Sequence, residues 1–434
     1  ATVLVSAGNN VAMPATISLS NSDREVLIVP HSPLPDSTLM TIKVDGVEDL
    51  AGNAVVVHTT QFTTGAGPDV AGPQVVRTNP FNGATGVPVN TVVTLESNQP
   101  LDPLTVNSNS IVVRDNTTFQ NLEGTVGLSM DGRTLTFVPN TPLAVGRSHS
   151  VFFAVFQSIQ DLAGNFASPT SFSFTTSFAA DVIGPQVTGV SPADGLTQAP
   201  INAQVVVTFN EPIQTQSVDN VTLLAGATPI AVTRSLTNGN RTLTLTPAVL
   251  LPANTLFTIN ITGVKDLAGN NLSSAVMSSF TTGTGADLIR PTITQVDPIN
   301  GATGVLTNAI VRLQFSERVN PLTVNNSTFQ VFVSGTNAPV TGSISLTSDG
   351  LSASFAPSAA LAPSTTYFIQ AFAITDLTGQ DINFFFTSFT TGTDNASFRR
   401  KPRLFEVASH RGHSAISKSS KRLYEIKLNH RRSK

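Results

Sequence analysis

The five-residue sequence DLAGN stands at residues 161–165, recurs at 49–53 and 266–270, and has a weaker copy, DLTGQ, at 376–380. The copies follow one another at intervals of about 110 residues. That interval is too long for one unit of a solenoid and fits one small domain. The sequence therefore predicts a string of similar domains rather than one large enzyme.

Other landmarks keep the same order around each copy. An Asp-x-x-x-Pro linker opens each full repeat, a turn-rich block that ends in Asn follows, and Phe-Thr-Thr closes the repeat. We number the resulting segments in chain order: repeat 1 (1–66), repeat 2 (67–178), repeat 3 (179–284), repeat 4 (285–393) and a C-terminal tail (394–434).

Repeat 1 is shorter than the other three. Ala1 aligns near the third strand of a full repeat, so we expect a partial repeat without its first strands and a sequence that is a fragment. Such a unit leaves strand edges unpaired and one core face uncovered.

Apolar residues alternate with Thr and other polar residues between these landmarks. In repeat 3, Val205, Val207 and Phe209 form one such series, and Leu243 and Leu245 belong to another. A period of two is typical of half-buried antiparallel strands. It predicts seven strands in repeat 3, near residues 186–190, 204–209, 221–225, 229–235, 242–247, 256–264 and 275–281. Seven short strands with frequent turns predict an all-β fold of tandem, seven-stranded Greek-key β-sandwiches.

Composition separates the repeats from the tail. The chain has no Cys, which excludes disulfides and thiolate metal sites, and it has no apolar run long enough for a membrane helix. Residues 1–393 contain 24 acidic and 12 basic residues, whereas 394–434 contain 3 acidic and 12 basic residues. We expect the basic tail to be a disordered extension; the alternative is an arm that binds nucleic acid or an anionic surface.

The ordered motifs resemble a known family. The motif Pro-x-x-Gly-Ala-Thr-Gly-Val within the turn-rich block is followed by Phe-Asn-Glu (209–211) or Phe-Ser-Glu (315–317), then by DLAGN and Phe-Thr-Thr. In this order the motifs resemble the bacterial Ig-like repeats of S-layer and other surface proteins. The resemblance covers roughly residues 1–393. It implies Ig-like sandwiches that serve as extracellular stalk or spacer modules, often attached to adhesins or secreted enzymes, with no shared active site. Repeat 2 departs from the pattern because Gln99 stands where Glu211 and Glu317 stand.

Carboxylates are expected to gather at one end of each full sandwich. The chain entry, the loop after the second strand and the loop before the last strand lie at that end. In repeat 3 these segments carry Asp181, Glu211 and Asp266, with Asn270. Clustered carboxylate and amide oxygens suit Ca²⁺, which takes 6–8 oxygen ligands.

The same positions differ among the other repeats. Repeat 4 offers Asp287, Glu317 and Asp376 for Ca²⁺, whereas repeat 2 offers only two aspartates beside Gln99. The alternative is that the DLAGN aspartate is a turn residue only. Asp accepts backbone N–H bonds at the start of a turn, and Gly-Asn tolerates a positive φ.

The sequence predicts no enzyme. Glu211 and Glu317 occupy equivalent positions of two domains, so they lie too far apart for the carboxylate pair of a glycosidase. We expect a non-catalytic extracellular or cell-surface region of a bacterial protein, acting as a spacer, stalk or adhesive repeat. The alternatives are a ligand- or carbohydrate-binding module and an accessory region of a secreted enzyme whose catalytic domain lies elsewhere. Partners would be a cell-surface or matrix protein or a glycan, with no nucleic acid bound by the repeats.

Overall fold

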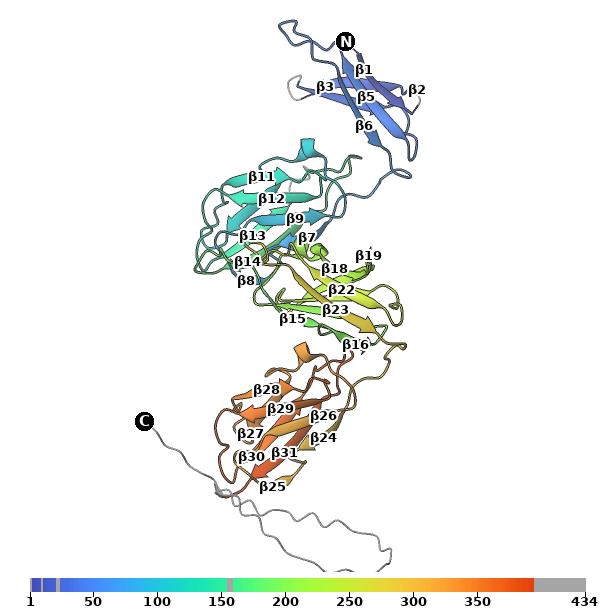
Figure 1. The fold of residues 1–434 in the computed structure, drawn as a ribbon. Helices are drawn as coiled ribbons and strands as arrows, with labels where there is room; N and C mark the ends of the chain where they lie inside the picture. The colour runs from blue at the N-terminus through green and yellow to red at the C-terminus, as the bar shows by residue number, and fades with distance from the viewer. Residues whose placement is uncertain (1, 9–10, 21–23, 154–158, 394–434) are drawn as a thin grey trace, which may run out of the picture.

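The computed structural model describes residues 2–8, 11–20, 24–153 and 159–393. These residues form β-strands and three short 3₁₀ helices, and the strands group into four units that follow one another along the chain (Figure 1). Among the described residues no helix has the length and apolarity needed to cross a lipid bilayer. The tail, predicted to be disordered, lies outside the described residues.

Repeat 3 is a sandwich of two sheets, as predicted. One sheet has the order β15 (Val187–Ser191), β17 (Val205–Phe209), β21 (Thr242–Pro247) and β20 (Val232–Thr237). The other has the order β16 (Leu196–Ala199), β23 (Val276–Thr282), β22 (Leu256–Ile261), β18 (Val221–Ala225) and β19 (Thr228–Pro229). All seven predicted strands have counterparts, and the predicted strand 229–235 is divided into β19 and β20.

One strand of each sandwich was not predicted. Strand β16 lies inside the turn-rich block and pairs in parallel with β23. It has counterparts in β8 (Ala84–Val87) and β25 (Ala302–Val305), which pair in parallel with the last strands of their own repeats. These four-residue strands, ATGV in β8 and β25 and LTQA in β16, are too short to show a clear alternation, so the block resembles a turn in sequence.

Repeats 2 and 4 have the same two sheets. In repeat 2 these are β7 (Val75–Asn79), β9 (Val93–Ser97), β12 (Thr134–Pro139) and β11 (Gly124–Leu128), packed on β8, β14 (Thr170–Thr176), β13 (Ser148–Phe153) and β10 (Ile111–Asp115). In repeat 4 they are β24 (Ile293–Asp297), β26 (Val311–Phe315), β29 (Ser352–Pro357) and β28 (Gly342–Leu346), packed on β25, β31 (Phe385–Thr391), β30 (Thr366–Ala371) and β27 (Phe329–Val333).

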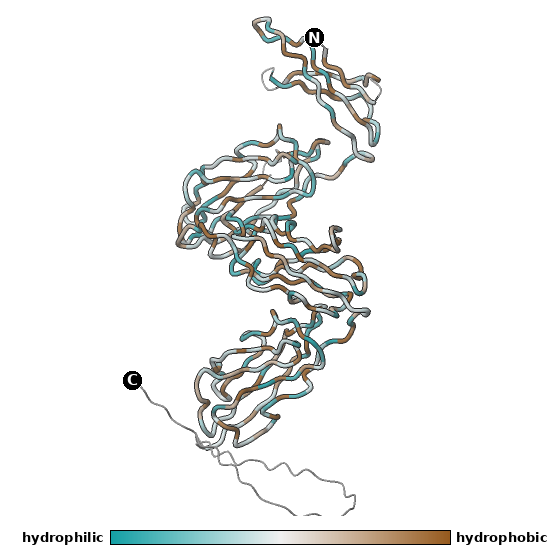
Figure 2. The backbone as a smooth tube through the Cα atoms, in the orientation of Figure 1, coloured by the Kyte–Doolittle hydropathy of each residue, from teal (hydrophilic) through white to brown (hydrophobic). Residues whose placement is uncertain are grey.

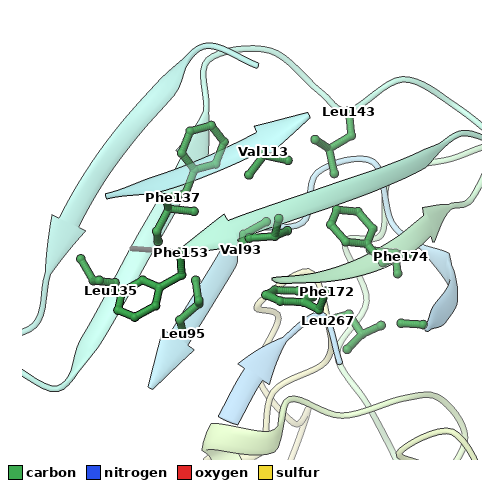
Figure 3. Packing of buried hydrophobic residues seen from close by; sticks show 14 of the residues in the cluster. Val93, Leu95, Val113, Leu135, Phe137, Leu143, Phe153, Phe172, Phe174 and Leu267 are labelled. Atoms are coloured by element: carbon green, nitrogen blue, oxygen red, sulfur yellow. The ribbon is translucent and has the colours of Figure 1, made fainter. Parts of the chain in front are cut away.

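The core of each sandwich follows from the alternation. Val205, Val207 and Phe209 point inward from β17 and are buried, while the residues between them are half-buried. Figure 3 shows the corresponding core of repeat 2, with Val93 and Leu95 of β9 facing the phenylalanines of the opposite sheet. Each such core holds its two sheets together by apolar burial.

Repeat 1 has fewer strands. Its main sheet has the order β2 (Val11–Ala12), β1 (Thr2–Ala7), β5 (Leu39–Asp45) and β6 (His58–Thr63), beside a hairpin of β3 (Ala15–Ser20) and β4 (Glu25–Pro30). Strands β1, β5 and β6 correspond to β18, β22 and β23, so the counterparts of β15, β16 and β17 are missing from the described residues of repeat 1. Among those residues only Val5 and Met40 are buried hydrophobic residues, although hydrophobic residues recur along the strands (Figure 2).

Candidate functional site

The DLAGN motif forms a tight turn in every repeat. In repeat 2, Asp161 Oδ1 accepts hydrogen bonds from the backbone N–H groups of Ala163 (2.8 Å) and Asn165 (2.9 Å). Asn165 Nδ2 donates to Asp161 Oδ2 at 2.9 Å, and Gly164 has a φ of 88°, which favours glycine. The turn role expected of the aspartate is therefore present, and it holds the carboxylate in one orientation.

In repeat 3 the predicted carboxylates come together. Asp181 lies in the linker before β15, Glu211 follows β17, and Asp266 precedes β23. One carboxylate oxygen from each lies within 4.8 Å of those of the other two. Asp266 is buried and the other two are half-buried, so part of the cluster is removed from water.

Asn270 lies beside this cluster as a hydrogen-bond donor. Its Nδ2 donates to Asp266 Oδ2 at 2.8 Å and to the backbone carbonyl of Asp181 at 3.1 Å. The amide therefore ties the turn of repeat 3 to the linker that enters the repeat.

Repeat 4 has a corresponding cluster in which buried carboxylate oxygens lack hydrogen-bond partners. Asp287, Glu317 and Asp376 also bring their carboxylate oxygens within 4.8 Å of one another. Gln380 replaces the turn asparagine, and its amide nitrogen donates to Thr378 Oγ1 and to the backbone carbonyl of Asp287 rather than to the Asp376 carboxylate. Asp376 is 1% exposed and its Oδ2 has no hydrogen-bond partner in the described structure.

The clusters change the acidity of their members. Burial, followed by the hydrogen bond and the charge of Asp181 and the charge of Asp266, raises the pKa of Glu211 to about 7. Burial and the nearby Asp287 likewise raise the pKa of Glu317 to about 7. Burial also raises the pKa of Asp266, against the hydrogen bonds from Asn270. These carboxylates are therefore costly to ionise together without a positive partner.

Repeat 2 satisfies the same position without a second carboxylate. Gln99 Nε2 donates to Asp161 Oδ2 at 2.8 Å and to the carbonyl of Ala71 at 2.7 Å. The amide thus supplies the positive ends of two N–H dipoles at the place where Glu211 brings a negative charge to repeat 3.

The linkers that enter repeats 3 and 4 are held by the repeat that precedes them. Asn90 Nδ2 donates to the carbonyl of Asp181 (2.7 Å), and Asn90 Oδ1 accepts from the N–H of Asp181 (3.0 Å). Asn202 makes the same pair of bonds with Asp287, at 2.7 and 2.9 Å. Each linker aspartate therefore has its backbone fixed to one repeat while its carboxylate joins the cluster of the next.

The leucine of the motif is a functional residue that the sequence analysis missed. Leu267 is only 3% exposed and lies among the buried side chains of repeat 2, although it belongs to repeat 3 (Figure 3). Its carbonyl accepts a hydrogen bond from Asn79 Nδ2 at 3.2 Å. Leu377 of repeat 4 is buried too, and its carbonyl accepts from the N–H of Gln204 in repeat 3 at 2.8 Å. An apolar residue at the same position of every turn was the available signal.

The junction between repeats 2 and 3 and the junction between repeats 3 and 4 differ in their other contacts. Between repeats 2 and 3, Arg77 of β7 forms an ion pair with Asp219 of the 3₁₀ helix η2 (Thr215–Asn220). Between repeats 3 and 4, Gly189 of β15 faces Leu322 of η3 (Pro321–Thr323), and a Cβ atom at Gly189 would clash with the leucine side chain. The glycine is needed there for close approach.

Comparisons with known proteins agree with this architecture. The profile of the bacterial Ig-like domain matches residues 69–176, 181–282 and 287–391, which together make up more than half of the chain. No curated protein matches at a significant level.

Solved structures give weaker likenesses. The N-terminal part of the bacterial S-layer protein SbsC is 15% identical, with 48% of this chain and 44% of that chain covered and a TM-score of 0.22. CopC from Methylosinus trichosporium OB3b is 20% identical, with 26% of this chain and 99% of that chain covered and a TM-score of 0.21. An L,D-transpeptidase from Mycobacterium smegmatis is 14% identical, with 38% and 61% covered and a TM-score of 0.17. The three profile matches decide the assignment: the chain belongs to the bacterial Ig-like domain family and carries three tandem copies of that domain.

Proposed function

We propose that this chain is a non-catalytic extracellular spacer or stalk region of a bacterial surface or secreted protein. Its working units would be repeats 2 to 4, bounded at 67–178, 179–284 and 285–393. The observation that carries the proposal is the insertion of Leu267 into the core of the preceding repeat. A side chain of one repeat that is buried in the core of the preceding one limits their relative motion, as a stiff stalk or spacer requires.

The linkers support a stiff arrangement. The linker into repeat 3 is bonded to repeat 2 through Asn90 and to repeat 3 through Asn270. The leucine adds buried apolar area between the same two repeats. Three attachments around one short linker leave little freedom for bending, and repeats 2 to 4 follow one another without folding back (Figure 1).

The test is small-angle X-ray scattering on the full chain. We expect the pair-distance distribution of an elongated particle, with a maximum dimension much greater than that of one sandwich. The double variant Leu267→Asp/Leu377→Asp should show greater flexibility, whereas Leu162→Asp serves as the matched control. A compact particle, or equal effects of the double variant and the control, would refute docking as the basis of the stalk.

A second function, ligand binding, is favoured by an aromatic cluster on the outer face of repeat 4. Phe332, Phe368 and Phe386 lie on neighbouring strands, with ring centroids 5.0 to 6.3 Å apart. Phe386 and the adjacent Phe384 are exposed. Exposed aromatic rings can stack on sugars or on an apolar partner. Glycan-array binding that is lost in Phe384→Ser/Phe386→Ser would support this function.

A further inference from the structure

We propose that repeats 3 and 4 each bind one divalent cation, with Ca²⁺ the best match, between the linker aspartate and two carboxylates of the repeat. The sites are Asp181, Glu211 and Asp266 in repeat 3, and Asp287, Glu317 and Asp376 in repeat 4. The ion would fasten each linker to the repeat that it enters. This inference goes beyond the spacer function and does not depend on it.

The first observation is a concentration of negative charge without a protein counter-charge. Three carboxylates share each cluster, with their oxygens within 4.8 Å of one another. Among the described residues, none of the ion pairs involves any of these six carboxylates. Like charges at this distance repel strongly where burial lowers the local dielectric constant. A cation removes that repulsion.

The second observation is independent of charge and concerns hydrogen bonding. Asp376 is 1% exposed, and its Oδ1 accepts from the N–H groups of Thr378 (2.7 Å) and Gln380 (3.0 Å). Its Oδ2 has no partner among the described residues, and neither does the buried Oε1 of Glu317 in the same cluster. A buried carboxylate oxygen without a partner is energetically costly, and a cation bound between these oxygens would remove that cost.

The third observation is the difference within the chain. In repeat 2, Asp161 Oδ2 accepts from Gln99 as well as from Asn165, whereas Asp266 Oδ2 of repeat 3 accepts from Asn270 and faces Glu211 in place of the glutamine. The linker aspartates are otherwise alike: Asp69 Oδ1 accepts from the N–H of Ala71 at 3.0 Å, and Asp181 Oδ1 accepts from that of Ile183 at 3.0 Å. One change of residue type thus distinguishes a junction that gains a second amide donor, from Gln99, from one that gains a third carboxylate, from Glu211.

The donor set selects the ion. All the side chains of both clusters offer oxygen only, and the chain has no cysteine. Hard cations prefer such ligands, whereas Zn²⁺ and Cu²⁺ prefer sites with nitrogen or sulfur. Ca²⁺ accepts irregular sets of 6–8 oxygens that include bidentate carboxylates and water, whereas Mg²⁺ demands near-ideal octahedral geometry. Three carboxylates on one linker and two loops fit Ca²⁺ better.

The test is isothermal titration of the chelator-treated full chain with CaCl₂ at pH 8. We expect two calcium ions per chain, one in Glu211→Gln, one in Glu317→Gln, and none in the double variant. Glutamine is nearly isosteric with glutamate and occupies the same position in repeat 2, so these variants keep the fold. Asp194→Asn is the matched control, because Asp194 is a carboxylate of repeat 3 that bonds to Ser279 outside the cluster. This control should still bind two ions.

Thermal melting supplies a second readout. Calcium that binds the folded form alone raises the melting temperature of the wild-type chain, by linkage, and leaves the double variant unchanged. Absence of calcium uptake, or uptake that the double variant retains, would overturn the proposal. In that case a proton shared within each cluster takes the place of the ion. Scattering by the wild-type chain decides the spacer function separately.

Discussion

Repeats 2 and 3 contain the same DLAGN turn, yet the leucine of the turn is exposed in repeat 2 and buried in repeat 3. Leu162 is 72% exposed, whereas Leu267 is 3% exposed. Leu162 lines a cleft of about 720 Å³ together with Phe62 of repeat 1. Leu267 meets Asn79, at the end of β7, and the apolar core of repeat 2. The described residues of repeat 1 include no counterpart of β7, so they offer Leu162 no such contact. Among the described residues, the leucine is buried where a complete sandwich precedes it and exposed where one does not.

The same two junctions differ in polar chemistry. Gln99 bonds to the turn aspartate of repeat 2, and Glu211 repels that of repeat 3. A neutral amide makes a junction that is complete by itself. If the proposed calcium sites exist, a carboxylate at this single position decides whether a repeat responds to cations.

Repeat 1 should give the largest difference in a digestion experiment. Its apolar residues are mostly exposed, for example Leu27 and Val29 of β4, while repeats 2 to 4 have closed cores. Local opening is easiest where few apolar contacts must be broken. Limited proteolysis followed by mass spectrometry should show cleavage within residues 1–66 well before any cleavage within 67–393. Equal resistance of all four repeats would show that the open face of repeat 1 is covered.

Truncation of the docked leucine should have the next largest effect. Leu267→Ala removes buried side-chain volume from the core of repeat 2, and such substitutions cost about 2–4 kcal/mol. Leu162→Ala should change the free energy of unfolding by less than about 0.5 kcal/mol, because that side chain is exposed. Calorimetric unfolding of the two full-length variants makes the comparison. Similar losses in both would contradict the assignment of Leu267 as an inter-repeat contact.

Exchange of the Gln99 amide for a carboxylate should have a smaller effect on stability. Gln99→Glu removes the donor to Asp161 Oδ2 and adds a like charge, which should destabilise repeat 2 by about 1–3 kcal/mol in the presence of a chelator. Calcium should recover much of that loss, because repeat 2 then has three carboxylates at its junction. The measurement is thermal melting with chelator and with calcium. Gln120→Glu adds the same charge at an exposed position of repeat 2 outside the cluster and controls for charge; an unchanged melting temperature of Gln99→Glu in chelator would contradict repulsion at this site.

Much of this arrangement could be predicted from local patterns. Alternation in stretches such as 204–209 indicated the strands, and sandwich topology then placed Asp181, Glu211 and Asp266 at one end. The burial of Leu267 could not be predicted in the same way. It depends on the surface of another repeat, whereas the identical Leu162 is exposed, so the motif alone does not decide the outcome.

The smallest expected effect is a difference between repeat 2 and repeats 3 and 4 in how their stability changes at low pH. Burial of Asp115 at the end of β10 opposes its ionisation, but hydrogen bonds from Arg147 and from the N–H groups of Thr117 and Thr118 outweigh burial and lower its pKa to about 2. A carboxyl whose pKa is lower in the folded than in the unfolded state, where it is near 3.8, stabilises the fold above that value. The contribution is lost as the pH falls from about 4 towards 2.

The corresponding positions of β18 and β27 are Ala225 and Val333, which cannot titrate. Asp115→Asn should therefore weaken the pH dependence of melting of repeat 2 between pH 4 and 2 and leave the melting of repeats 3 and 4 unchanged. The substitution also loses the ion pair with Arg147, so the variant should melt lower than the wild type at pH 5, with the difference shrinking as both approach pH 2. Parallel melting curves of variant and wild type across this range would show that Asp115 has the same affinity for protons in the folded and unfolded chain.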